Sequence, residues 1–212
     1  AKRCLAAHTR EDQALFAICQ GGMNLDMRLE SIRRLKEISD ESVRSGHKDF
    51  KGFGIGGYSV GEDHEVMFET LGDVARACPE DKPRYVMGVG NPTTLVRAVH
   101  EGVDMFDCVM PTRNGRNGML FTKDGIMNMR NKKWEMDFSP IEADGASYVD
   151  TMYSKAYLRH LFHAQELLAM QIASIHNLAF YLWLAGEARK HIIAGDFATW
   201  KPMMVKRVST RL

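Results

Sequence analysis

RYVMGVGNPTTLVRAVHEGVDMFDCVM, residues 84–110, decides the fold of this chain. An apolar run at 84–89 ends at Gly90, and Asn91-Pro92 is typical of the cap and first turn of a helix, here continuing through TLVRAVHEG. A second apolar run, DMFDCVM, follows at 104–110. This order predicts two parallel strands joined by a helix.

The same order occurs twice before residue 84. ALFAIC at 14–19 ends at Gln20-Gly21-Gly22 and precedes a helical pattern at 25–38. FGI at 53–55 ends at Gly56-Gly57 and precedes a helical pattern at 65–77. Runs that are apolar at every position are typical of parallel strands covered on both faces. The sequence therefore predicts an α/β fold.

Beyond Arg116 the pattern changes. Residues 118–131 alternate around a Lys123-Asp124-Gly125 turn, which predicts a hairpin. Three helices are expected from Tyr153 to the end, and the middle one is strongly apolar. We expect one partial domain over 1–212, with β/α units at 14–117, a hairpin and irregular insertion at 118–152, and C-terminal helices at 153–212.

Composition narrows the function classes. The 212 residues carry a formal charge of +1, so a nucleic-acid site must be a local basic patch. No apolar run approaches the roughly 18 residues of a membrane span, and the N-terminus lacks the apolar core of a secretory signal. The four cysteines are scattered without a CxxC pair. A cytoplasmic protein without a membrane partner is expected.

Polar and glycine residues stand at the predicted strand ends, where parallel α/β folds gather active-site groups. The amide of Gln20 suits the edge of a nucleobase, and Gly57 allows backbone N–H groups to approach a ligand. Met87 is a soft wall for an aromatic ring. Asp107 directly follows bulky apolar residues and has the chemistry of a nucleophile or a general base.

Each of these positions also has a purely structural interpretation. A strand-end Asp often caps a helix or anchors a loop, glycine pairs form turns, and methionine suits a core. PTRNGRNG at 111–118 holds Arg113 and Arg116, which suit phosphate contact, or else it is a solvated loop. GVGNPT at 88–93 lacks the third glycine of a dinucleotide fingerprint and is interpreted as a strand-to-helix turn.

Several long segments together resemble the tRNA-guanine transglycosylases, also called queuine tRNA-ribosyltransferases, of the bacterial type. They are QALFAICQGG, FGIGGYSVGE, DKPRYVMGVGNP, DMFDCVMPTRNGRNG and SKAYLRHL with IHNLAFYL. The resemblance runs from about Arg10 to the end. It implies a homodimer that exchanges the wobble guanine of GUN-anticodon tRNAs for 7-aminomethyl-7-deazaguanine in queuosine biosynthesis. It also implies a (β/α)8 TIM barrel, of which this chain holds about the last four units.

The resemblance also assigns roles to single residues. The nucleophile falls on Asp107, which would bond to the ribose C1′ with the two-step logic of a retaining glycosidase. Base recognition falls on Gln20, Gly57, Tyr58 and Met87, with Ser59 and Glu62 supporting the same loop, and tRNA contact falls on Arg113 and Arg116.

Two departures from the family pattern alter these expectations. The cysteines of the family's zinc site fall on Gly145, Ser147 and Asp150, and only His176 matches its histidine. One histidine and one acid cannot form a tetrahedral thiolate site, so no metal or other cofactor is expected. The N-terminal half of the barrel, with the family's other substrate acids, has no counterpart here, and this chain alone is expected to be inactive.

Two other function classes stay open at this point. One is a non-catalytic partner subunit that binds tRNA beside an active transglycosylase, although Asp107 and Gln20 would then have no evident use. The other is a different barrel enzyme acting on a phosphorylated small molecule, for which GVGNPT is the sequence signal. Formation of a covalent tRNA adduct would distinguish an enzyme from a binder.

Overall fold

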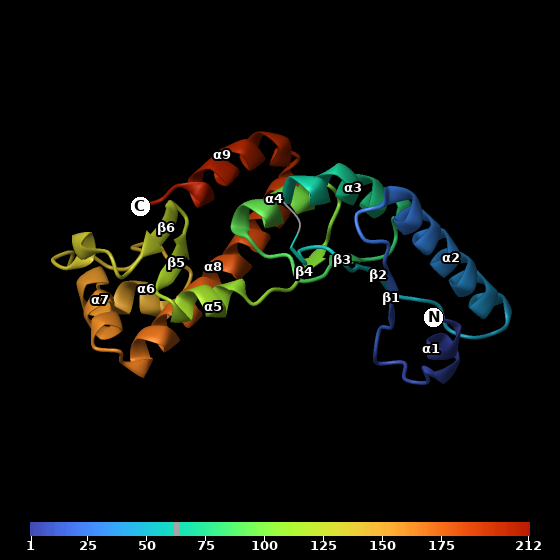
Figure 1. The fold of residues 1–212 in the computed structure, drawn as a ribbon, viewed down its shortest axis with the longest axis horizontal. Helices are drawn as coiled ribbons and strands as arrows, with labels where there is room; N and C mark the ends of the chain where they lie inside the picture. The colour runs from blue at the N-terminus through green and yellow to red at the C-terminus, as the bar shows by residue number, and fades with distance from the viewer. Residues whose placement is uncertain (62–63) are drawn as a thin grey trace. The chain divides into compact units, whose positions relative to one another are not determined.

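The computed structural model describes residues 1–61 and 64–212. The chain forms two compact units, one of Ala1–Gly90 with Ala98–Cys108 and the other of Asn91–Arg97 with Val109–Leu212. Each unit has its own hydrophobic core. Figure 1 labels the helices and strands. The single domain expected over 1–212 stays a prediction.

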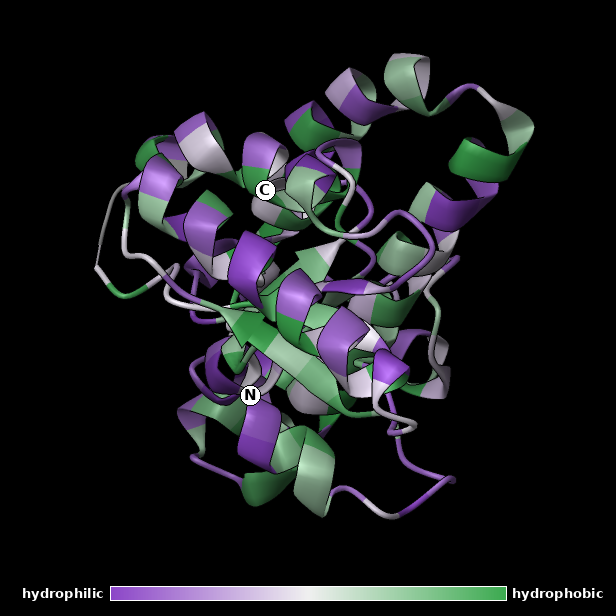
Figure 2. Cartoon of the chain, turned by 90° about the vertical axis from the view of Figure 1, so that its right-hand side faces the viewer, coloured by the Kyte–Doolittle hydropathy of each residue, from purple (hydrophilic) through white to green (hydrophobic). Residues whose placement is uncertain are grey.

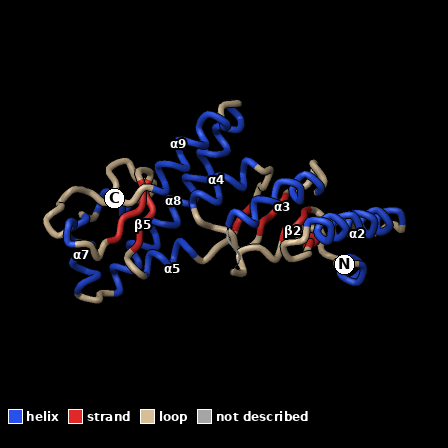
Figure 3. The backbone as a smooth tube through the Cα atoms, turned by 45° about the horizontal axis from the view of Figure 1, so that its top comes forward, coloured by secondary structure: helices blue, strands red, loops and turns tan. Residues whose placement is uncertain are grey.

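A four-stranded parallel sheet with the order β1-β2-β3-β4 forms the first unit. Its strands, red in Figure 3, are β1 (Phe16–Cys19), β2 (Gly52–Ile55), β3 (Arg84–Val86) and β4 (Met105–Phe106). The chain between the strands forms α2 (Leu25–Arg44), α3 (His64–Ala77) and α4 (Pro92–His100), and α1 (Lys2–Ala7) precedes β1. The predicted α/β class with a parallel sheet is confirmed.

The core of this unit lies between the sheet and helices α2 and α3. Helix α2 begins after Asn24, whose side chain accepts a hydrogen bond from the Met27 N–H at 2.9 Å. Its buried residues recur at helical spacing and are Arg28, Ile32, Leu35 and Ser39. The strands contribute Ala17, Cys19, Phe53, Ile55 and Val86. Figure 2 shows an apolar strand among helices whose outward turns are hydrophilic.

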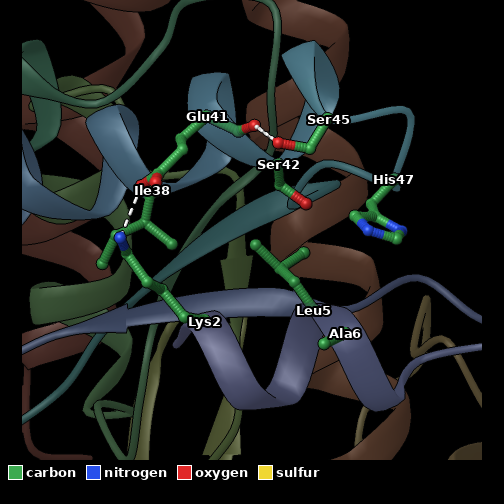
Figure 4. A pocket seen from close by; sticks show the side chains of 8 residues that line it. All are labelled: Lys2, Leu5, Ala6, Ile38, Glu41, Ser42, Ser45 and His47. Atoms are coloured by element: carbon green, nitrogen blue, oxygen red, sulfur yellow. Dashed lines mark hydrogen bonds and ion pairs between the residues drawn. The ribbon is translucent and has the colours of Figure 1, made fainter.

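Helix α1 packs beside α2 across a shallow pocket (Figure 4). Lys2 forms an ion pair with Glu41 at 2.5 Å, and Leu5 is buried against the core. The remaining lining residues are Ala6, Ile38, Ser42, Ser45 and His47. None of the predicted site residues lines this pocket.

The second unit is built around a hairpin and a long helix. Strands β5 (Met119–Thr122) and β6 (Gly125–Asn128) pair antiparallel, which confirms the predicted hairpin. The helices are α5 (Met110–Arg116), the 3-10 turn η1 (Lys132–Trp134), α6 (Tyr148–Met152), α7 (Lys155–His163), α8 (Leu167–Ala194) and α9 (Phe197–Ser209). The last three confirm the predicted C-terminal helices.

Helix α8 is the central element of this unit. Among the described residues it alone is long and apolar enough to cross a membrane by length and composition. However, one side of it packs against α5, β5 and α7 and buries Ile172, Phe180 and Leu184. The core helix of a globular unit has the same composition, and this packing accounts for the apolar sequence of α8.

Candidate active site

The four parallel strands end in register. Cys19 pairs with Ile55, Ile55 with Val86 and Val86 with Phe106. The next residues on the four strands are Gln20, Gly56, Met87 and Asp107. Hydrogen bonds continue the ladder one step further, from Gly56 N–H to Cys19 O and from Met87 N–H to Ile55 O, both at 3.1 Å. The residues expected to share one edge of the sheet therefore follow a single row, which spans roughly 14 Å at about 4.8 Å between strands.

The side chains of this row belong to one face of the sheet. Because successive strand residues alternate between faces, Gln20, Met87 and Asp107 lie opposite the buried face of Cys19, Ile55, Val86 and Phe106. On the same face β2 offers only glycines, at positions 52, 54 and 56. An added Cβ at Gly54 would meet the Met87 Sδ at 3.5 Å, and one at Gly52 would collide with the Phe16 ring at 2.4 Å. Backbone alone therefore forms the β2 part of this face.

Asp107 is exposed, and its two carboxylate oxygens differ. The Tyr85 hydroxyl donates to Oδ1 at 2.6 Å, and the Gly88 N–H donates to the same oxygen at 2.9 Å. Gly88 has a φ of +74°, a conformation that favours glycine, and the turn it forms aims its N–H at the acid. Oδ2 has no hydrogen-bond donor among the described residues. The carboxylate is thus oriented by two donors and keeps one oxygen available.

Tyr85 holds its proton in this arrangement. The hydrogen bond to Asp107, followed by partial burial and by the negative charge of the same carboxylate, raises the pKa of Tyr85 to about 12. At neutral pH the phenol therefore donates to Asp107 and does not compete with it as a nucleophile. This pair could not be predicted from the sequence, because Tyr85 and Asp107 meet only through the pairing of β3 with β4.

Gln20 and the turn after β2 lie against each other. A Cβ added at Gly56 would lie 2.5 Å from the Gln20 Nε2, and a Cβ added at Gly57 would lie 2.6 Å from the Gln20 Oε1. A side chain at either position would therefore displace the amide. Gly57 has a φ of +73°. Within residues 1–61 and 64–212 neither its N–H nor the Gln20 side-chain amide has a hydrogen-bond partner. A flat polar ligand could use both groups.

The other residues of the predicted base-binding loop differ in exposure. Tyr58 is buried, and its hydroxyl lies 2.6 Å from the Thr70 hydroxyl. Ser59 is exposed with a φ of +60°, whereas Met87 is half-buried. Glu62 lies outside the described residues. Direct ligand contacts of these side chains stay predictions.

Arg28 is a buried residue of this region that was not predicted from the sequence. This side chain on α2 is completely buried, and its guanidinium lies 3.6 Å from the centre of the Tyr58 ring. It donates to the carbonyl oxygens of Gly22, Gly56 and Gly57 at 2.6, 2.9 and 3.2 Å. The available signal was its position in the otherwise apolar helical spacing 28, 32, 35.

The two predicted tRNA-contacting arginines lie on α5 in the second unit. Arg113 and Arg116 are exposed, and neither forms an ion pair with any residue the structure describes. The segment is a short helix rather than the solvated loop considered above. Its first turn is held by Asn177 of α8, which is fully buried and donates to Pro111 O at 2.8 Å and to Met119 O at 3.0 Å.

Comparison with known proteins agrees with the resemblance seen in the sequence. Residues 1–210 match the family model described as queuine tRNA-ribosyltransferase. The chain belongs to the queuine tRNA-ribosyltransferase family.

Curated relatives carry the same name. The queuine tRNA-ribosyltransferase of Francisella tularensis subsp. novicida is 47% identical over 201 residues, covering 95% of this chain and 52% of the relative. That of Pelotomaculum thermopropionicum is 46% identical over 207 residues, covering 98% of this chain and 53% of the relative. The chain thus spans about half the length of the queuine tRNA-ribosyltransferases it matches.

The zinc site implied by the queuine tRNA-ribosyltransferase family does not fit the residues present. Glu142, Asp150 and His176 are the described group whose ligand atoms lie within 4.8 Å of one another, and none offers a thiolate. Both nitrogens of His176 face oxygen acceptors, with Nδ1 2.5 Å from Asp150 Oδ1 and Nε2 2.8 Å from Phe121 O. Both nitrogens thus contact oxygen atoms of the protein.

The same residues form a buried hydrogen-bonded link instead. Asp150 and His176 are each 1% exposed. Burial alone would raise the pKa of Asp150, but the hydrogen bond and charge of His176 and the Ser147 N–H, 2.7 Å from Oδ2, lower it overall. An added Cβ at Gly145 would meet Asp150 Oδ2 at 2.3 Å. Gly145 and Ser147, on which the resemblance places zinc cysteines, thus pack against a carboxylate that joins α6 to α8.

Proposed function

We propose that the protein is a tRNA-guanine transglycosylase in which Asp107 forms a covalent bond to the ribose of tRNA. The observation that carries the proposal is the row Gln20–Gly56–Met87–Asp107, with an amide at one end and an exposed, oriented carboxylate at the other. Family membership supports the reaction class.

In the first step Asp107 Oδ2 attacks C1′ of the target nucleotide. The C1′–N9 bond breaks, and guanine leaves with its electron pair. Tyr85 and Gly88 donate to Oδ1, which fixes the carboxylate so that Oδ2 faces the sugar. Donors at Gln20 and Gly57 stabilise the charge that develops on the departing base. The product is an ester between Asp107 and the tRNA.

In the second step a deazaguanine base takes the place of guanine. Its ring N–H loses the proton to water, from which the departed guanine takes one up, and the nitrogen attacks C1′ from the side that guanine left. The ester bond to Asp107 breaks and the carboxylate is regenerated, as in a retaining glycosidase. We propose 7-aminomethyl-7-deazaguanine as the incoming base, Met87 as a wall for its ring, and Arg113 and Arg116 as phosphate contacts. We further propose that the complete protein is a cytoplasmic homodimer with a (β/α)8 barrel.

The test replaces Asp107 with Ala in the full-length protein that contains residues 1–212. Exchange of radiolabelled guanine into tRNA should fall by at least ~1000-fold, and a denaturation-resistant tRNA adduct should no longer form. Asp104→Asn is the matched control, because Asp104 is an exposed acid beside the same strand, and among the described residues its side chain accepts a hydrogen bond from the Arg84 N–H alone. Exchange by Asp107→Ala at the wild-type rate would refute the mechanism.

A further inference from the structure

Arg28 is a charged side chain in the protein interior, where burial of a charge is unfavourable. Its side chain is fully buried in the first turn of α2, at the end of the helix where the backbone dipole is already positive. Its guanidinium donates hydrogen bonds to three carbonyl oxygens, and no carboxylate among the described residues pairs with it. If position 28 served only for packing, an apolar residue in line with Ile32 and Leu35 would do as well.

The three carbonyl groups belong to two different turns. Gly22 follows β1, whereas Gly56 and Gly57 follow β2. Nε binds the first turn at 2.6 Å, and the two terminal nitrogens bind the second at 2.9 and 3.2 Å. The planar guanidinium therefore fixes both turns relative to each other, which a lysine with a single nitrogen cannot do.

This contact sets the direction of a backbone donor. In a trans peptide the carbonyl of one residue and the N–H of the next point to opposite sides, and the described chain has no cis peptide bond. Because the Gly56 carbonyl points to Arg28, the Gly57 N–H points away from it. That N–H has no acceptor within residues 1–61 and 64–212, and the Gln20 amide lies directly against the same peptide.

We propose that Arg28 is a positioning residue that holds the Gly57 N–H as a hydrogen-bond donor for the bound purine base. The inference rests on the proposed function, since it takes the base to be the ligand of Gln20 and Gly57. It predicts that Arg28 controls affinity for the free base and leaves affinity for tRNA nearly unchanged.

The test measures guanine exchange by full-length Arg28→Lys and Arg28→Met proteins. The KM for guanine should rise by about tenfold or more, the effect of losing one hydrogen bond, while the KM for tRNA changes by less than about threefold. Arg34→Lys is the control, because Arg34 is exposed on the same helix and pairs with Glu30. A purely structural role would lower the fraction of active enzyme, measured as covalent tRNA adduct, and leave both KM values unchanged; that result would overturn the proposal.

Hydrogen–deuterium exchange on the unmodified protein provides an answer that does not depend on the variants folding. Adding guanine should slow amide exchange in a peptide covering 56–58 and leave one covering 33–44 unchanged. Absence of that protection would overturn the inference even if both variants are unfolded. A wild-type protein that protects 56–58 but exchanges no guanine would instead refute the proposed function and leave the role of Arg28 in base binding intact.

Discussion

At the scale of single residues, Asp107 shows how a strand-end acid is oriented by its neighbours. Two neutral donors, the Tyr85 hydroxyl and the Gly88 N–H, share one of its oxygens. Neither donor carries a positive charge as an arginine would, and together they restrict the rotation of the carboxylate. The orientation comes from β3, and the acid itself follows β4.

Replacing Tyr85 with Phe tests this orientation. Loss of one hydrogen bond to a charged acceptor, worth about 1.5 kcal/mol, should lower kcat about tenfold with little change in the KM for tRNA. The titration of tyrosinate absorbance should also lose a component with a pKa of about 12. Tyr157→Phe, at another partly exposed tyrosine, is the control.

The raised pKa of Tyr85 also has a consequence for stability. The unfolded phenol titrates near 10 and the folded one near 12, so the folded state binds the proton more tightly. The contribution to the free energy of unfolding is complete below pH 10 and is lost as pH rises to 12. Wild type should therefore lose stability over this window more steeply than Tyr85→Phe, and parallel curves would contradict the assignment.

Only some residues of the candidate site could be predicted from the sequence. Asp107, Gln20 and Gly57 could be selected because they stand where apolar runs end, and the strand register brings these ends into one row. Tyr85 and Arg28 were not predicted as site residues. Tyr85 binds Asp107, which lies 22 residues further along the chain. Arg28 binds the carbonyl of Gly56, 28 residues further along, and a backbone carbonyl has no sequence signature.

At the scale of elements, α5 shows how a segment that contains a glycine can still be helical. Its sequence MPTRNGR contains a weak helix former, and the segment was not predicted as a helix. Gly115 allows α5 to approach α8 so closely that an added Cβ would lie 3.0 Å from both the carbonyl carbon and oxygen of Ala173. Tertiary contact therefore outweighs the local propensity.

The same substitution at two glycines should have opposite effects. Gly115→Ala places a methyl group against the backbone of α8, which cannot move aside, and should lower the free energy of unfolding by about 1 kcal/mol or more. Gly186→Ala, on α8 with no atom within 4 Å of the new Cβ, should raise it by about 0.5–1 kcal/mol. Chemical denaturation would measure both, and equal shifts would contradict this account of the contact.

The hydrogen bond between Asp150 of α6 and His176 of α8 leads to a prediction about metal content. Since Asp150 and His176 are hydrogen-bonded to each other and the described group Glu142, Asp150 and His176 contains no cysteine, we expect the purified protein to contain well under one zinc per chain. Elemental analysis would measure this, and treatment with EDTA should leave the melting temperature unchanged. One tightly held zinc per chain, with a lower melting temperature after its removal, would show the interpretation to be wrong.

At the scale of the whole molecule, the chain covers about half of each relative it matches. On the sheet face that carries Gln20 and Asp107, Ile18 is 48% exposed and Met105 44%. Large apolar side chains on a sheet face are ordinarily covered by further structure. We therefore expect a polypeptide of residues 1–212 alone to show no guanine exchange, while the full-length protein is active.

The measurement is the same exchange assay on both proteins at equal concentration, with circular dichroism to establish that the shorter one is folded. Activity of the shorter protein within about tenfold of the full-length enzyme would show that the row of strand ends is sufficient by itself.

The family could be predicted from sequence because its long segments are uninterrupted. The two compact units could not, because no Pro-, Gly- or Ser-rich linker separates Cys108 from Val109.

The contact between Phe16 and Gly52 has an evolutionary consequence. The phenyl ring already occupies the space that a side chain at position 52 would need. The two positions are therefore not independent: a larger residue at 52 requires the Phe16 ring to turn aside or residue 16 to be smaller. Orthologues should consequently show these two sites changing in concert, with the summed side-chain volume of the pair held nearly constant.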